Sequence, residues 1–304
     1  MMKNKTASRH PIKLTASDRL FNVSVILITA FFTLLVLIPL WNIVVSSFSD
    51  VDAVLAGKVT LWPVDFSLAG YRAVFSNSDV GTGYLNTILY TVIGTIINIS
   101  MTLICAYPLT RPELPFRGAI MFLFTFTMFF GGGLIATYLN ISSLNMINTF
   151  WVMVLPGAMS TYNMILARTF IQSSIPNDLL EAARIDGCSY TRYFFQIVLP
   201  LSPAIIAVLS LNYAVGHWNS YFSALIYLRS RTKFPLQLFL REILVANTID
   251  DSMLVDPESN EIKKGIAEVL KYALIIVSTL PVLCFYPFAQ RYFMQGMMIG
   301  SLKG

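Results

Sequence analysis

The strongest constraint on this chain is a series of apolar runs, each close to the length that crosses a bilayer. A helix needs about 20 mostly apolar residues to span the hydrocarbon core. A window of that width finds six such runs, near residues 23–45, 84–107, 118–138, 147–167, 201–226 and 267–289. The sequence therefore predicts an all-α membrane protein with six transmembrane helices, whose transmembrane domain covers residues 23–289.

Charged residues are too scarce for an ordinary soluble domain. They make up 12% of the 304 residues, and hydrophobic residues make up 56%, whereas an average soluble domain has roughly 25% charged residues. The first apolar run is longer than the roughly 7–15-residue core of a secretory signal, and no small-residue cleavage site follows it. We expect that run to remain as the first spanning helix.

Basic residues beside the apolar runs predict the orientation, because short loops rich in Lys and Arg stay in the cytoplasm. The N-terminal segment 1–22 carries five basic residues against one acidic residue, Asp18. Both termini, including the tail 290–304, and the loops 108–117 and 168–200 are therefore expected in the cytoplasm. The net charge of +5 reflects this orientation, and we expect no nucleic-acid partner.

Histidine and cysteine are too few and too scattered to predict a metal site or a disulfide framework. His10 and His217 are the only histidines, and the three cysteines lie far apart in or beside apolar runs. An intramembrane enzyme would need a nucleophile with a base beside it, and His217 has no evident partner group. We expect no catalytic residue, no metal ion and no cofactor bound by this chain.

The loop 174–200 between the fourth and fifth runs has the signals of a short helix. Pro176 suits a first helical turn, Asp178 and Glu181 place negative charge near the positive end, and Gly187 suits the stop. The predicted helix has about ten residues and is roughly 15 Å long. It is too short to span a bilayer and too charged to sink into one.

The surface of this short helix suits a close contact with another protein. Ala182 and Ala183 have little side-chain bulk, and charged side chains are available at the margins, namely Glu181, Arg184 and Asp186. A second short amphipathic piece, Tyr190 to Val198, leads to Pro200 at the foot of the fifth run, so a push on the helix would reach a membrane helix. The alternative is an interfacial helix that rests among lipid headgroups.

These residues resemble the EAA loop of binding-protein-dependent ABC importers. The matching features are Glu181-Ala182-Ala183, three further residues, Gly187, nine further residues, and Ile197-Val198-Leu199-Pro200. The six apolar runs, the polar stretch 214–220 and the tail 296–304 also resemble the second permease of carbohydrate importers, such as those for maltose. Within that group, the chain is most similar to the branch associated with complex oligosaccharides and polysaccharides.

The resemblance implies a type I importer permease fold, multi-pass in the bacterial plasma membrane, that translocates a sugar. It also implies a heterodimer with a second permease subunit, two ATPase subunits, and an extracellular sugar-binding lipoprotein that delivers an oligosaccharide. No Gly-x-x-x-x-Gly-Lys-Ser/Thr phosphate loop occurs in the chain, so ATP and Mg are expected on the partner ATPase. The residues carried over to ATPase coupling are Glu181, Ala182, Ala183, Arg184, Asp186, Gly187 and Pro200. In the family, a tail like 290–304 reaches the ATPase.

An ion-coupled secondary carrier is the alternative function. A carrier would be expected to hold acidic residues within its spans. The only carboxylate close to one is Glu268, at the edge of the sixth run. The sequence therefore favours a permease driven by ATP hydrolysis on another subunit.

The fifth apolar run carries the polar residues best suited to a sugar pathway. Aromatic rings and hydrogen-bonding groups recur there at helical spacing, at about 16 to 30 Å from Leu201 along the helix. The candidate pathway residues are Asn212, Tyr213, His217, Trp218, Asn219 and Tyr221. The alternative is that these side chains hydrogen-bond neighbouring helices and never meet a substrate.

Overall fold

The computed structural model describes residues 15–249, 269–287 and 290, and every regular element in these ranges is a helix. In chain order these are α1 (Ala16–Ser47), α2 (Val51–Leu55), α3 (Ala69–Ser76), α4 (Ser78–Ala106), η1 (Pro108–Thr110), α5 (Arg117–Phe129), α6 (Gly133–Ser143), η2 (Trp151–Met153), α7 (Thr161–Ser174), α8 (Asn177–Ile185), α9 (Tyr190–Tyr193), η3 (Phe194–Val198), α10 (Pro203–Trp218), α11 (Tyr221–Tyr227), η4 (Arg231–Lys233) and α12 (Leu236–Ile249). A further helix covers Val269–Pro287. The predicted tail 290–304, apart from its first residue, and Glu268 lie outside the described residues.

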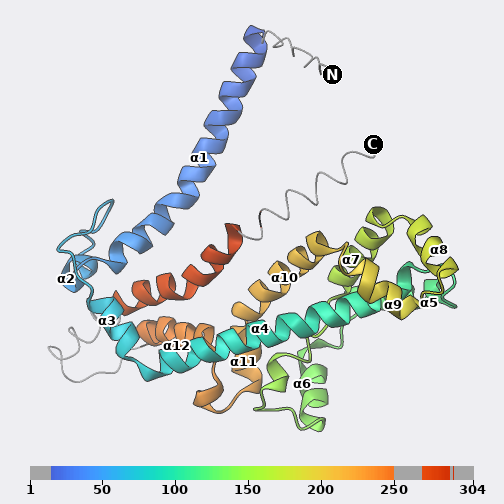
Figure 1. The fold of residues 1–304 in the computed structure, drawn as a ribbon. Coiled ribbons are helices and arrows are strands. Elements are labelled where there is room, and N and C mark those ends of the chain that lie inside the picture. Colours follow the sequence, from blue (N-terminus) through green and yellow to red (C-terminus); the bar gives the residue numbers. More distant parts are fainter. Residues whose placement is uncertain (1–14, 250–268, 288–289, 291–304) are drawn as a thin grey trace.

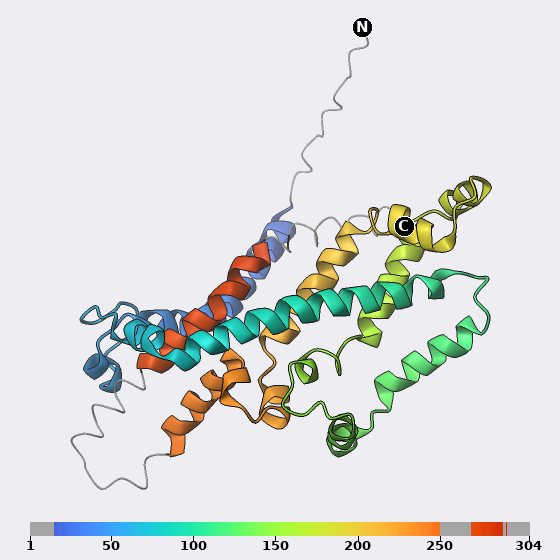
Figure 2. The same cartoon turned by 60° about the horizontal axis from the view of Figure 1, so that its bottom comes forward.

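Helix α4 is the central element, and α3, α7, α10 and α12 pack on it (Figure 1). Asn77 caps its start by accepting a hydrogen bond from the Asp79 N–H at 2.9 Å. Helices α3 and α12 lie at the end where α4 begins, and α8 and α9 lie at the opposite end, as both views show (Figure 2). Helices α7 and α10 pack along the second half of α4, so α4 connects the two ends of the molecule.

The contact between α4 and α10 depends on a glycine. A β-carbon on Gly94 would lie 2.6 Å from Cε1 and 2.8 Å from Cδ2 of His217. The imidazole fills the space that a side chain at position 94 would need, and its Nε2 makes a 2.6 Å hydrogen bond with Asn98 Oδ1 on the next turn of α4. The absence of a side chain therefore lets a polar pair join the two helices.

Helix α1 stands away from the other helices (Figure 1). A capping box formed by Thr15 and Asp18 starts it, and only its last residues, Val45, Ser46 and Ser47, are buried. Residues 16–41 of this apolar helix are exposed within the chain, and residues 42–44 are partly buried. Its side chains need lipid or another membrane protein to cover them.

The number of helices that could span a membrane differs from the six predicted runs. Three helices in the described part of the chain are long and apolar enough, namely α1, Ser78–Thr110 and Val269–Pro287. Two bent pairs raise the number to five if each pair is one span. These are α5 with α6, bent by 114°, and Tyr190–Val198 with α10, bent by 85°.

Breaks in the apolar runs account for this difference. Run 118–138 divides at the glycines before α6, and Gly133 has a φ of +76°. Run 147–167 contains only η2 and the first half of α7, with irregular backbone around Pro156. Run 201–226 divides between α10 and α11. Irregular backbone in a membrane protein is tolerated where another element pairs with its free N–H and C=O groups. Here Asn98 Nδ2 of α4 donates a 2.5 Å hydrogen bond to the Gly157 carbonyl.

Candidate functional site

The short helix predicted in the loop 174–200 is present as α8 (Asn177–Ile185). It ends in a Schellman turn, in which the Cys188 N–H donates to the Ala183 carbonyl at 2.9 Å and the Gly187 N–H donates to the Arg184 carbonyl at 3.0 Å. Gly187 has a φ of +76°, a conformation that glycine adopts without a side-chain penalty. The end of α8 is therefore set by local sequence.

Two side chains on one face of α8 attach it to the rest of the chain. Leu180 and Ala183 are buried in a core cluster that also contains Met164 of α7 and Val198 of η3. Ala183 therefore faces the chain's own core, although the sequence interpretation placed it on a surface for a partner. The adjacent Ala182 is exposed.

The opposite face of α8 is open. Glu181 and Ala182 are exposed, and Ile185 is 87% exposed. Ile185 lies between two charged residues, Arg184 and Asp186, on this open face. The sequence interpretation missed Ile185, although its position opposite the buried Leu180 and Ala183 could have identified it.

The charged residues at the margins of α8 make weak contacts within the chain. Arg184 Nη1 lies 3.8 Å from Glu113 Oε1, and both side chains are about half exposed, so this pair adds little stability. The Arg184 guanidinium also lies 5.6 Å from the centre of the Tyr190 ring. Asp186 is the C-cap residue of α8 and is exposed.

Helix α8 is connected to α10 through a short helical segment, α9 and η3. Helix α9 begins at Tyr190, is capped by the hydroxyl of the preceding Ser189, and continues into the π-helical turn η3. Tyr193 and Val198 in this segment are buried, whereas Pro200 is exposed just before α10 begins. Buried contacts therefore connect α8 with the foot of α10.

Three of the six candidate pathway residues are held between helices. The Tyr213 hydroxyl lies 2.7 Å from Thr102 Oγ1 and accepts a hydrogen bond from the Ser160 N–H at 3.1 Å. His217 pairs with Asn98, as described above. Trp218 Nε1–H donates to the Ser278 carbonyl at 2.9 Å. For Tyr213, His217 and Trp218, polar packing between helices describes the observed contacts.

Asn212 lies at the edge of a hollow of about 490 Å³ between α7, α10 and the helix Val269–Pro287. Asn212 Nδ2 donates to Asn163 Oδ1 at 3.2 Å, and Tyr162 and Tyr286 supply two exposed rings. Amide groups between aromatic rings are suited to hydrogen bonding and stacking with a sugar. The sequence interpretation missed Tyr162, Asn163 and Tyr286 because they lie on other helices.

Asn219 and Tyr221 are exposed but do not line this hollow. They follow the end of α10 at Trp218, so the helical spacing that linked them to Asn212 in the sequence does not continue. The six candidate pathway residues therefore fall into three groups. Three are packed between helices, Asn212 alone lies at the hollow, and Asn219 and Tyr221 are exposed beyond the end of α10.

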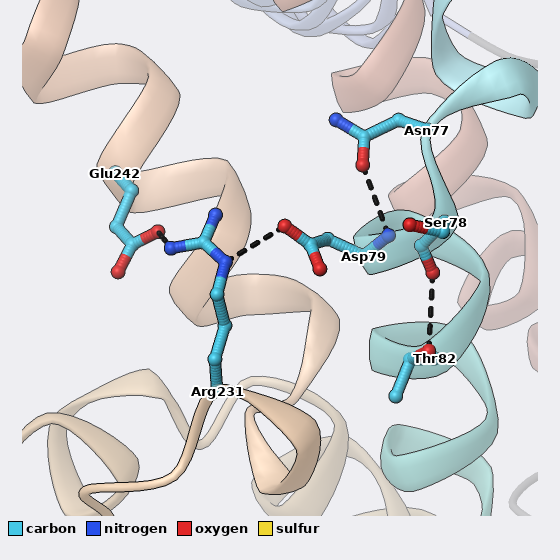
Figure 3. Close-up of polar contacts among 6 residues, drawn as sticks. All are labelled: Asn77, Ser78, Asp79, Thr82, Arg231 and Glu242. Carbon is cyan, nitrogen blue, oxygen red and sulfur yellow. Dashed lines mark hydrogen bonds and ion pairs between the residues drawn. The ribbon is translucent and has the colours of Figure 1, made fainter.

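Arg231 joins three segments at the end of the molecule opposite α8 (Figure 3). Its Nε lies 2.7 Å from Asp79 Oδ2 on α4, and its Nη1 lies 3.2 Å from Glu242 Oε2 on α12. The hydrogen bond to Asp79 is the main cause that raises the pKa of Arg231 above its ordinary value. This cluster fastens the segment after α11 to the start of α4.

Comparisons with known proteins identify relatives over nearly the whole chain. A family model described as binding-protein-dependent transport system inner membrane component matches residues 80–299. The polygalacturonan/rhamnogalacturonan transport system permease protein YtcP of Bacillus subtilis (strain 168) is 38% identical over 290 residues, which cover 94% of this chain and 99% of the relative. Protein LplC of the same organism is 36% identical over 304 residues, which cover 98% of this chain and 100% of that protein.

One solved structure has a similar fold. It is described as a bacterial ABC transporter involved in the import of the acidic polysaccharide alginate. The matching chain is 31% identical, with a TM-score of 0.84, and the match covers 93% of this chain and 100% of that chain. The helices described above are therefore arranged as in a transporter subunit.

Proposed function

Because the chain belongs to the family of binding-protein-dependent transport system inner membrane components, we propose that it is a permease subunit of an ABC importer that carries an oligosaccharide into a bacterial cell. The observation that supports this most strongly is similarity over nearly the full length to a polygalacturonan/rhamnogalacturonan permease and to a subunit of an alginate importer. The chain itself provides a path through the membrane, and a separate ATPase supplies the energy.

In this proposal, α8 is the part of the chain that contacts the ATPase. Its exposed face, with Glu181, Ala182 and Ile185, enters a cleft on the cytoplasmic side. When ATP draws two ATPase subunits together, α8 moves with them, and its buried residues transmit the movement through α9 to α10. Hydrolysis then returns the transmembrane cavity to the inward-facing state.

The exposed surface of α1 supports a second permease subunit as a partner. Nearly all of this apolar helix lies outside the chain's own core. A neighbouring permease would cover part of the surface, and lipid would cover the rest. An extracellular sugar-binding lipoprotein would deliver the substrate to the pair.

The hollow beside Asn212 is the proposed sugar contact of this subunit. The Asn212–Asn163 pair provides donors and acceptors, and the exposed rings of Tyr162 and Tyr286 provide stacking surfaces. The candidate residues Asn219 and Tyr221 extend this polar surface toward the outer side in the proposal.

Charge reversal at Glu181 tests the docking face. The full transporter, with its ATPase and binding protein, would be purified with Glu181→Lys and reconstituted in vesicles. Sugar uptake should fall on the order of tenfold, because loss of a central contact with reversal of its charge weakens docking strongly. ATP hydrolysis should lose its stimulation by the binding protein, or the ATPase should separate from the complex.

A matched control reverses an exposed charge far from α8. Lys58 is exposed and follows α2, so Lys58→Glu should leave uptake and ATPase stimulation unchanged. If Glu181→Lys also retained wild-type coupling, the assignment of α8 to ATPase docking would be wrong.

A further inference from the structure

Arg111 is a largely buried cation that makes no ion pair with the described residues. It directly follows η1, after the end of α4. The residue is only 8% exposed, and its Nε–H has no hydrogen-bond partner among the described residues. Its Cζ lies 4.8 Å from the centre of the Tyr107 ring and 5.7 Å from that of the Tyr193 ring. Cation–π contacts recover only part of the cost of removing a guanidinium from water.

A second polar group beside Arg111 is also unsatisfied. Tyr193 is fully buried, and its hydroxyl has no hydrogen-bond partner in the described part of the chain. Buried donors are nearly always paired in folded proteins, so two unpaired donors in contact need an explanation. The Tyr193 hydroxyl and Arg111 Nε are both enclosed by protein atoms, so a ligand outside the chain would meet Arg111 only through the small part of its side chain that remains exposed.

Arg111 lines a hollow of about 530 Å³ beside α9. Two charged side chains line this hollow, Arg111 and Glu113, and the Arg184 guanidinium lies beside it, over the Tyr190 ring of its wall. The Glu113 carboxylate also lies 3.8 Å from Arg184, measured from Oε1 to Nη1. Two cations against one carboxylate leave a positive charge that an anionic ligand would balance.

The remainder of the hollow is apolar and faces outward at the end of a membrane helix. Ile104 on α4 is 56% exposed and Phe195 on η3 is 58% exposed, and Leu114 and Phe194 complete the wall. The occupant must therefore combine an anionic group with an apolar chain. A free inorganic anion would leave these apolar side chains uncovered.

We propose that this hollow binds an anionic phospholipid, with its phosphate on Arg111 and an acyl chain along Ile104 and Phe195. Basic pockets between helices at a membrane surface are recognised in this way by lipid headgroups. The site lies on the same membrane face as α8. Its wall includes Tyr190 and Phe194, so a bound lipid would contact the segment that connects α8 with α10.

Native mass spectrometry of the assembled transporter tests the site directly. Complexes would be released from vesicles that contain phosphatidylglycerol and phosphatidylcholine in equal amounts. The wild type should retain phosphatidylglycerol about tenfold more than phosphatidylcholine, as expected for a charge-assisted contact with a buried guanidinium. Arg111→Gln should reduce this ratio to about one. Arg117→Gln removes a positive charge at the start of α5 on the same membrane face and should keep the wild-type ratio.

Thermal unfolding distinguishes lipid binding from a structural role of Arg111. In phosphatidylcholine alone, Arg111→Gln should be about as stable as the wild type, because the cost of burying the wild-type cation offsets what its ring contacts contribute. Adding phosphatidylglycerol should raise the Tm of the wild type and leave that of the variant unchanged. A variant that is equally destabilised in both lipids would show that Arg111 acts through its ring contacts alone, and would overturn the proposal.

Two further measurements complete the test. If Arg111→Gln does not fold, Arg111→Lys keeps the charge and should retain a smaller preference for phosphatidylglycerol, about fivefold weaker than that of the wild type. Inorganic phosphate added to phosphatidylcholine vesicles should not raise the Tm. Equal retention of the two lipids by the wild type, or a full rise in Tm with phosphate alone, would refute a lipid site.

Discussion

Replacing Gly94 with alanine tests the contact that joins α4 to α10. The new β-carbon would lie 2.6 Å from Cε1 and 2.8 Å from Cδ2 of His217, closer than β-carbons are found to neighbouring atoms. Overpacking of this kind costs about 1–3 kcal/mol. If the imidazole moves, Asn98 Oδ1 loses its 2.6 Å hydrogen bond, which adds about 1–3 kcal/mol. Better helix propensity of alanine returns about 1 kcal/mol, so the free energy of unfolding should fall by about 1–5 kcal/mol.

Thermal or denaturant unfolding of the purified protein in detergent would measure this change. Gly216→Ala is the matched control on α10, because a β-carbon at Gly216 meets no atom within 4 Å, and its stability should be unchanged or slightly higher. In a His217→Ala background, Gly94→Ala should cost much less, since the clashing ring is absent. Equal effects of Gly94→Ala and Gly216→Ala, or an unchanged cost in the His217→Ala background, would refute this account of the contact.

Three other substitutions give distinct outcomes. Tyr213→Phe removes the hydroxyl between α4, α10 and the start of α7, and should lower the free energy of unfolding by about 1–3 kcal/mol; a stability equal to that of the wild type would contradict the assigned hydrogen bonds. Arg231→Ala should cost no more than about 1 kcal/mol, because its ion pairs are partly exposed, and the difference should shrink as salt is added during unfolding. Asn212→Ala should reduce sugar uptake or change the range of sugars transported while the Tm stays within about 2 °C of wild type, as for a surface substitution; unchanged uptake and range would remove Asn212 from the pathway.

Local features of the loop 174–200 were predictable from sequence because they depend on neighbouring residues. Helix α8 begins just after Pro176 and ends at the positive φ of Gly187, and both signals act within one helical turn. The face on which each residue lies was less certain. Ala183 is buried, because the cluster around Leu180 and Met164 lies on that side of α8.

The polar residues of α10 show why a pathway could not be assigned from one helix. Helical spacing predicts which residues share a face, but it does not say which neighbour covers that face. Tyr213, His217 and Trp218 meet partners on α4, at the start of α7 and on the helix Val269–Pro287, all distant in sequence. Asn212 is different because its neighbour Asn163 borders a hollow.

The sequence by itself determined that this chain is a helical membrane protein with a short charged helix in the loop 174–200. Composition and the length of the apolar runs leave few other ways to satisfy the backbone in lipid. Tertiary structure decided where those runs break and which polar residues are covered. Glycine and proline interrupt a membrane helix only where another element satisfies the freed backbone groups, as Asn98 does for the Gly157 carbonyl. That partner lies 59 residues away in the chain, so no local pattern could have revealed it.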